Sequence, residues 1–192
     1  MFKTEIDKEI RLELISQSHI KEFLALFEKN SEHIGRWVNY PKENTLEYLE
    51  KSIESSLVSY QKNRILSCVV FYNNKIVGFI SIWGMGSNPK MIRKGELTYW
   101  LDKEHQNMGI MRRAIEKIIE LGFTRYELDK IVVRVAIGND RSMNIPIKLG
   151  FHLDGVLRRD MKVNEKFQDL NIYSLLREEY KGEKYESFKN IC

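Results

Sequence analysis

The stretch GELTYWLDKEHQNMGIMRRAIEKIIELGF, residues 95–123, decides the fold predicted for this chain. Residues 95–102 have the pattern of a β-strand, and residues 110–123 repeat apolar side chains at helical spacing. The polar loop between them contains Gly109. A helix that packs its apolar face on a sheet brings the amides of residues 107–111 to a strand's carboxyl edge, where they can bind phosphate. An ordinary connection, with Gly109 supplying backbone freedom, stays open as the alternative.

Elements of both kinds surround this stretch. The predicted strands are residues 10–15, 65–72, 75–83, 94–102, 130–138, 152–164 and 166–176. The predicted helices are residues 16–30, 45–62, about 110–123 and the segment that ends at Gly150. Residues 31–41, SEHIGRWVNYP, fit neither period and are predicted to form a loop or a broken helix. The order βααβββαβαββ predicts a mixed α+β fold in the broad α/β class, with helices on both faces of one sheet.

Composition limits the class of protein. The chain has 192 residues, 43% of them hydrophobic and 11% aromatic, so we expect one domain over residues 1–192. Its 31 basic and 27 acidic residues give a net charge of +4, which permits a phosphorylated ligand but is too small to indicate nucleic acid. The charged N-terminus and the lack of a long apolar run predict a cytoplasmic protein with no membrane contact. The Cys and His spacing predicts no metal site.

A second segment, GNDRSMNIPIKLGF at residues 138–151, breaks a local rule. Asn139 is a good N-cap, with Ser142 three residues later. Pro146 lies inside the short helix, where its ring opposes the carbonyl of Ser142. The helix is therefore expected to be distorted at Ser142, either for a function or as a kink that the fold accommodates.

These two segments, followed by a strand that ends in YSLL, resemble the GNAT superfamily of acetyl-CoA-dependent N-acetyltransferases. Within it, they resemble the RimJ/RimL branch, which acetylates ribosomal-protein N-termini. The resemblance covers about residues 8–180 and rests on the Gln-x-x-Gly loop, the Asn-x-x-Ser-x-x-x-Pro helix and the terminal strand in combination. Asn107, where the branch usually has Gly, and Arg112, where Thr is common, depart from its pattern.

The resemblance implies a mostly antiparallel seven-stranded sheet whose fourth and fifth strands splay apart to admit the pantetheine of acetyl-CoA. The loop would bind the pyrophosphate, and the backbone near Trp100 and Leu101 would bind the pantetheine and the acetyl group. The Trp100 ring itself is more simply explained as part of the core. The implied cofactor-binding residues are Trp100, Leu101, Gln106, Asn107, Met108, Gly109, Ile110, Met111, Asn139 and Ser142.

The resemblance also implies roles in catalysis. Glu96 is the candidate general base, acting through water, with a surface strand glutamate as the alternative. Ser142 would donate a hydrogen bond to the departing thiolate. Trp37 and Tyr40 fall where the branch builds its acceptor pocket, although Trp37 could equally cover the core.

The predicted function is therefore acetyl transfer from acetyl-CoA to a primary amine, either a protein N-terminus of the ribosomal kind or a small amine such as a polyamine or aminoglycoside. A non-catalytic CoA-binding module is a second class, and the pairing of Glu96 with Ser142 argues against it. A nucleic-acid-binding domain is a third class, indicated only by the small positive charge. No direct contact with nucleic acid is expected, and a homodimer is compatible with the sequence.

Overall fold

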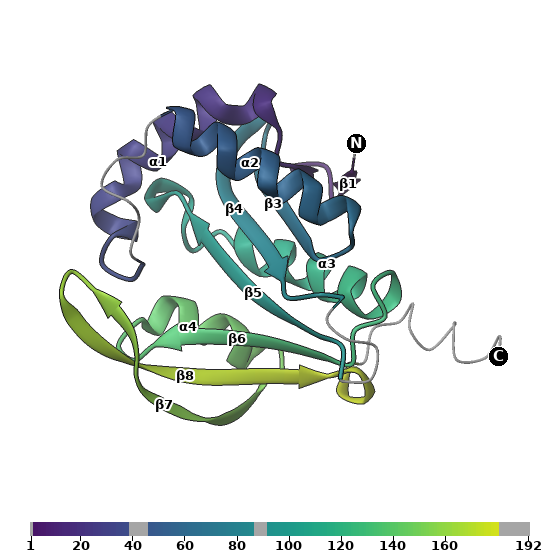
Figure 1. Ribbon diagram of the computed structural model, residues 1–192, viewed down its shortest axis with the longest axis vertical. Helices are drawn as coiled ribbons and strands as arrows, with labels where there is room; N and C mark the ends of the chain where they lie inside the picture. The colour runs from purple at the N-terminus through teal and green to yellow at the C-terminus, as the bar shows by residue number, and fades with distance from the viewer. Residues whose placement is uncertain (1, 39–45, 87–91, 181–192) are drawn as a thin grey trace, which may run out of the picture.

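The computed structural model describes residues 2–38, 46–86 and 92–180. Within them, eight strands form one sheet in the order β1-β2-β3-β4-β5-β6-β8-β7. All neighbouring strands pair antiparallel except β5 and β6, which are parallel because helix α3 connects them. The mixed fold with a mostly antiparallel sheet is confirmed (Figure 1).

Most predicted elements form within a residue or two of their expected bounds. The strands are β2 (Ile10–Leu14), β3 (Ile65–Tyr72), β4 (Lys75–Trp83), β5 (Lys94–Leu101), β6 (Lys130–Ala136), β7 (His152–Val163) and β8 (Lys166–Leu176). The helices are α1 (Ile20–Ile34), α2 (Leu46–Gln61), α3 (Ile110–Thr124) and α4 (Asp140–Lys148), with short 3-10 turns η1 (Gln17–His19), η2 (Lys103–His105) and η3 (Arg177–Glu179).

Two details differ from the sequence prediction. The sheet has eight strands and not seven, because β1 (Lys3–Glu5) pairs antiparallel with β2. Three residues are too few to show an alternating pattern. Helix α1 begins at Ile20, after the 3-10 turn η1, and continues to Ile34, so it lies four residues later than the predicted helix 16–30 and the first four residues of the stretch 31–41 are helical.

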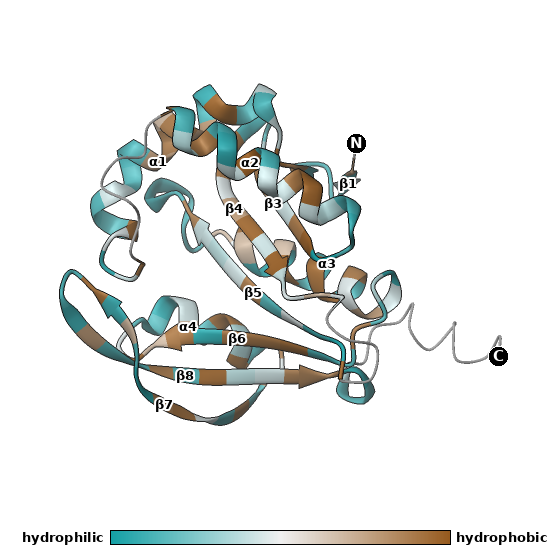
Figure 2. Ribbon diagram, viewed as in Figure 1, coloured by the Kyte–Doolittle hydropathy of each residue, from teal (hydrophilic) through white to brown (hydrophobic). Residues whose placement is uncertain are grey.

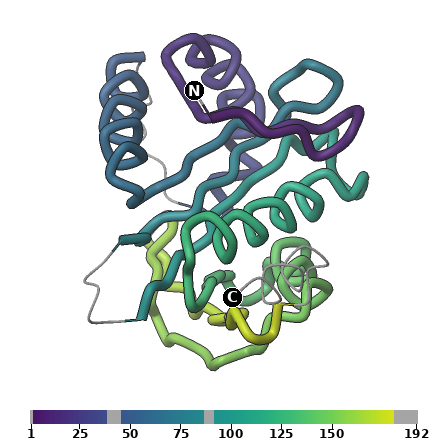
Figure 3. The backbone as a smooth tube through the Cα atoms, turned by 90° about the vertical axis from the view of Figure 1, so that its right-hand side faces the viewer, coloured from purple at the N-terminus to yellow at the C-terminus, as the bar shows by residue number. Residues whose placement is uncertain are grey.

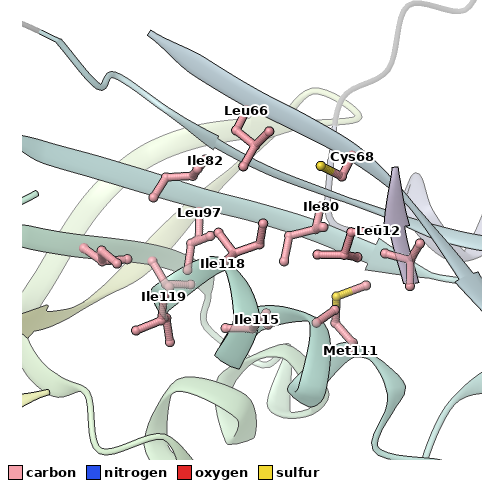
Figure 4. Packing of buried hydrophobic residues seen from close by; sticks show 14 of the residues in the cluster. Leu12, Leu66, Cys68, Ile80, Ile82, Leu97, Met111, Ile115, Ile118 and Ile119 are labelled. Atoms are coloured by element: carbon pink, nitrogen blue, oxygen red, sulfur yellow. The ribbon is translucent and has the colours of Figure 1, made fainter. Parts of the chain in front are cut away.

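The helices cover opposite faces of the sheet. Helix α3 packs its apolar side on the larger core, where Met111, Ile115 and Ile118 meet side chains of β2 to β5 (Figure 4). Helices α1 and α2 cover the other face, on which Phe23 and Phe27 pack around Trp100. The two layers are visible from the side in Figure 3, and Figure 2 shows many brown, apolar residues along β4 and β6. Trp100 is therefore a core aromatic.

The sheet opens between β5 and β6. Their ladder runs from Lys94 paired with Lys130 to Leu97 paired with Val133, and no pair follows although both strands continue. Figure 1 shows the two strands diverging beyond that point. We call this opening the gap. The predicted splay is thus confirmed, between the fifth and sixth strands once β1 is counted.

Candidate active site

The loop before α3 presents free amides toward the end of the gap. Asn107 and Gly109 have positive φ values of 62° and 71°, so the chain turns sharply just before the helix. Asn tolerates this left-handed geometry almost as well as the Gly expected at position 107. The backbone N–H groups of residues 107 to 111 donate to no acceptor within the described part of the chain. Such a cluster at a helix N-terminus fits a phosphate group.

A buried polar network fixes the start of this loop. The carboxylate of Asp102, at the end of β5, is 1% exposed and accepts hydrogen bonds from Asn30 (2.9 Å), His105 (2.7 Å) and Lys29 (3.3 Å). Asn30, itself buried, accepts from the amide of Lys103 at 2.9 Å. Burial alone would raise the pKa of Asp102, but these hydrogen bonds together lower it. An ionised Asp102 therefore holds the loop against α1.

Gln106 connects three elements. Its side-chain oxygen accepts a hydrogen bond from Arg141 of α4, and its nitrogen lies 2.7 Å from Nε2 of His33 on α1. With the oxygen turned to Arg141, the amide nitrogen donates, so Nε2 of His33 accepts and the ring is neutral. Burial lowers the pKa of His33, and the charges of Arg141, Arg36 and Lys103 lower it further.

The register of β5 decides which backbone groups enter the gap. The amide of Asp102 donates to Val77 on β4, and the carbonyl of Arg93 accepts from residues at the start of β6. Because bonding directions alternate along a strand, Tyr99 and Leu101 turn their N–H and C=O groups toward β6, while Trp100 turns its own toward β4. No paired β6 residue meets Tyr99 or Leu101. The gap therefore offers an extended ligand two unpaired residues of strand edge.

Helix α4 borders the gap through Ser142. The side chain of Asn139 accepts from the Ser142 amide at 3.3 Å, which confirms the predicted N-cap. Although Pro146 lies inside α4, the helix stays continuous from Asp140 to Lys148. The carbonyl of Ser142, which loses its helical donor to Pro146, accepts from the hydroxyl of Tyr99 at 3.0 Å. The predicted disturbance at Ser142 thus takes the form of a changed hydrogen-bond partner.

Glu96 lies at the vertex of the gap, one residue before the ladder ends. Its Oε1 accepts from Nε of Arg134 at 2.7 Å, and Nη1 of the same arginine lies 3.0 Å from the carboxylate of Asp160 on β7. The side chain of Glu96 is 23% exposed. Glu96 is therefore part of a three-residue ion cluster that joins β5, β6 and β7.

Of the two aromatic candidates for the acceptor pocket, Trp37 lies within the described residues and Tyr40 does not. Trp37 follows the end of α1 in a turn, with its amide donating to Ile34 at 3.0 Å, and it is half-buried. The nearby carbonyl of Gly35 accepts from the side chain of Asn164, in the β7–β8 turn, at 3.1 Å. The end of α1 therefore contacts the tip of the β7–β8 hairpin.

Several residues of this site are not evident from the sequence. His33, Arg141, Tyr99, Arg134 and Asp160 make contacts that depend on pairings between distant segments. The sequence offers one usable signal, the proline four residues after Ser142, which indicates that another group must bond that carbonyl.

In residues 2–38, 46–86 and 92–180, no group of three or more His, Cys, Asp or Glu side chains is arranged to hold a metal ion. Within the same ranges, no helix has the length and apolar character needed to span a bilayer.

Comparison with known proteins places this geometry. The model of the acetyltransferase (GNAT) domain family matches residues 9–152. The chain is 28% identical over 186 residues to the putative ribosomal N-acetyltransferase YdaF of Bacillus subtilis, covering 96% of this chain and 100% of that protein. It is 23% identical over 171 residues to the ribosomal-protein-serine acetyltransferase of Escherichia coli, covering 88% and 94%. The crystal structure of the microcin C7 self-immunity acetyltransferase MccE, in complex with acetyl-CoA and AMP, aligns with a TM-score of 0.82 and 26% identity, covering 89% of this chain and 94% of that chain.

Proposed function

Because the chain belongs to the acetyltransferase (GNAT) domain family and is an acetyl-CoA-dependent N-acetyltransferase, we propose that its acceptor is the α-amine at the N-terminus of a ribosomal protein. The observation that carries the proposal is the gap between β5 and β6, which leads to the free amides of residues 107 to 111. Support for this acceptor comes from two nearly full-length relatives whose names refer to ribosomal N-acetylation and ribosomal-protein acetylation.

The donor-binding part of the proposal uses two sets of backbone groups. The amides of the loop and of the first turn of α3 receive the pyrophosphate of acetyl-CoA, with Gln106 held in place by Arg141 and His33. The unpaired edge at Tyr99 and Leu101 bonds the amides of pantetheine as a neighbouring strand would. A fixed N–H of Leu101 near the thioester carbonyl could stabilise developing oxyanion charge by about 3 kcal/mol.

We assign roles in the acetyl transfer itself to Ser142 and Glu96. Ser142 donates a hydrogen bond to the sulfur as it leaves, and Asn139 keeps that residue at the first turn of α4. Glu96 uses its second carboxylate oxygen, which bonds no described residue, to hold a water or the acceptor ammonium. Because the Arg134 guanidinium already occupies Oε1 of Glu96, a water held between the other carboxylate oxygen and the amine is the route for the proton.

A small polyamine is the second candidate acceptor. The two carboxylates of Glu96 and Asp160 at the vertex of the gap would attract a ligand with several ammonium groups. Arg134 already contacts both carboxylates, which favours an acceptor with a single amine.

We also propose that the enzyme acts in the cytoplasm and makes no direct contact with membrane or nucleic acid. A homodimer is compatible with this function.

Release of free thiol from acetyl-CoA tests the proposal. The enzyme is mixed in parallel with peptides that copy ribosomal-protein N-termini, the same peptides with a blocked α-amine, and spermidine. We expect turnover with the free α-amine peptides alone. Turnover with spermidine only would identify a polyamine as the acceptor. A salt-dependent gel shift with RNA would instead support the hypothesis of a nucleic-acid-binding domain.

A further inference from the structure

Tyr99 makes two contacts with a single residue across the mouth of the gap. Its hydroxyl donates to the carbonyl of Ser142 at 3.0 Å, and the hydroxyl of Ser142 lies 3.2 Å from the Tyr99 oxygen. Tyr99 belongs to the part of β5 that no longer pairs with β6, whereas Ser142 belongs to α4. These bonds therefore join the two walls of the gap.

The hydroxyl protons can be assigned by counting donors. A phenol has one proton, and that of Tyr99 is given to the Ser142 carbonyl. The phenol oxygen can then only accept, so the serine proton points at it. Both the backbone and the side chain of Ser142 are fixed by one phenol, which restricts the rotamer of the serine.

Pro146 explains why the carbonyl of Ser142 is available. In an uninterrupted helix the amide of residue 146 would bond that carbonyl, and proline has no N–H. A partly buried carbonyl without a donor is unfavourable, so the Tyr99 hydroxyl replaces the amide that Pro146 lacks. Burial raises the pKa of Tyr99 to about 12, although the bond with Ser142 opposes the rise. Tyr99 therefore stays a neutral phenol at any working pH.

We propose that Tyr99 is a positioning residue that holds the Ser142 hydroxyl at the gap, ready to turn to the leaving sulfur. The inference rests on the proposed role of Ser142. When the amine nitrogen bonds the acetyl carbon, the carbon–sulfur bond breaks and its electron pair stays on sulfur. The serine O–H then turns from the Tyr99 oxygen to the sulfur without losing its proton. The proton released by the amine goes to water near Glu96, and Tyr99 keeps its own.

Tyr99→Phe tests the inference because it removes both contacts and keeps the ring. Loss of one hydrogen bond from the reacting arrangement should lower kcat by about 3- to 10-fold with less than about a twofold change in the acetyl-CoA KM. Tyr126→Phe is the matched control, since the buried hydroxyl of Tyr126 has no hydrogen-bond partner within the described residues. That control should keep the wild-type kcat.

A double-mutant cycle separates positioning from general loosening. In a Ser142→Ala background, Tyr99→Phe should cause no further loss of kcat, because the group that it positions is absent. An equal loss in both backgrounds, or a change in KM alone, would overturn the inference. If Ser142→Ala is impaired and Tyr99→Phe is not, only the role of Tyr99 fails. Wild-type kcat in Ser142→Ala would overturn the role of Ser142 and the inference with it.

A second variant guards against misfolding. Adding Pro146→Ala to Tyr99→Phe returns a helical N–H to the Ser142 carbonyl but leaves the serine hydroxyl without its partner. We expect the melting temperature to recover while kcat stays low. Recovery of both would show that Tyr99 serves only the stability of α4, and would overturn the inference.

Discussion

Gly109 occupies a position that few residues can adopt. Its φ of 71° lies in the left-handed region, and an added Cβ would meet no atom within 4 Å. The space is open, so the restriction comes from the backbone conformation alone. A residue that strongly disfavours positive φ should change the direction of the following backbone amides without disturbing the core.

Gly109→Val is therefore expected to lower the affinity for acetyl-CoA by at least about 10-fold, because a β-branched residue strongly disfavours left-handed geometry. Gly109→Asn is the matched control, since Asn tolerates that geometry, and it should bind more tightly than the Val variant. Isothermal titration calorimetry measures both. Equal affinity of the wild type and the Val variant would remove the loop from the binding site.

Glu96→Gln should lower kcat/KM by about 10²-fold, the low end of general-base contributions, and the loss should shrink as the pH rises through the amine pKa near 8. Asp160→Asn is the control, because it removes the other carboxylate from Arg134 without changing the vertex of the gap. We expect a loss of only a few-fold there. A flat ratio of wild type to Glu96→Gln from pH 6 to 9 would make Glu96 a structural partner of Arg134.

His33 gives the loop a pH dependence with a definite sign. Its pKa is lowered in the folded chain, so the stability that comes from its neutral form is complete above the ordinary histidine pKa of about 6.5. That stability is lost as the pH falls through the lowered value. The melting temperature of the wild type should therefore fall faster below pH 6.5 than that of His33→Gln, which can still accept from Gln106. Parallel curves would contradict this account.

At the scale of elements, the Asp102 network connects α1 with the loop before α3. One buried carboxylate accepts from two side chains of α1 and from His105 of η2, so movement of the helix and of the loop are coupled. The helix that contributes these donors also ends beside Trp37. Donor and acceptor sides of the proposed site therefore share a rigid support.

Asp102→Asn should lower the free energy of unfolding by about 1–3 kcal/mol, because an amide cannot accept from all of these donors with both of its groups. The acetyl-CoA KM should rise as the loop loosens. Glu104→Gln is the control, since Glu104 bonds the same Lys29 but its side chain is 69% exposed, and its change should stay below about 1 kcal/mol. Urea unfolding and initial rates give the two readings, and equal stability of both variants would contradict the role of Asp102.

Across the whole molecule, the structural features that depend on neighbouring residues can be predicted from the sequence. Near neighbours determine the amphipathic repeat of α3 and the hairpin turn at Asn73 and Asn74, whose φ values are 47° and 65°. They also determine the end of α4, where Gly150 has a φ of 78°. Strand β1 could not be predicted, because its three residues show no pattern of their own and form a strand only by pairing with β2. The extent of a single domain over residues 1–192 stays a prediction.

The site divides in the same way. The loop, the cap at Asn139 and the proline at position 146 are contiguous signals, whereas the ion cluster of Glu96 and the bond from Gln106 to His33 join segments between 26 and 73 residues apart. Register makes a further distinction that the residue types do not. Neighbours Trp100 and Leu101 turn their backbones to opposite strands, so only Leu101 faces the gap.

We propose that the acetyl-CoA bound in this gap gives its acetyl group to protein N-termini, and mass spectrometry of ribosomal proteins measures that transfer. Unacetylated ribosomal proteins are incubated with acetyl-CoA and either the wild type or Gly109→Val, and the N-terminal peptides are sequenced. We predict a gain of one acetyl group on the α-amine of at least one protein with the wild type, and little or none with the variant. Unmodified α-amines throughout, under conditions in which the same enzyme acetylates spermidine, would contradict the claim.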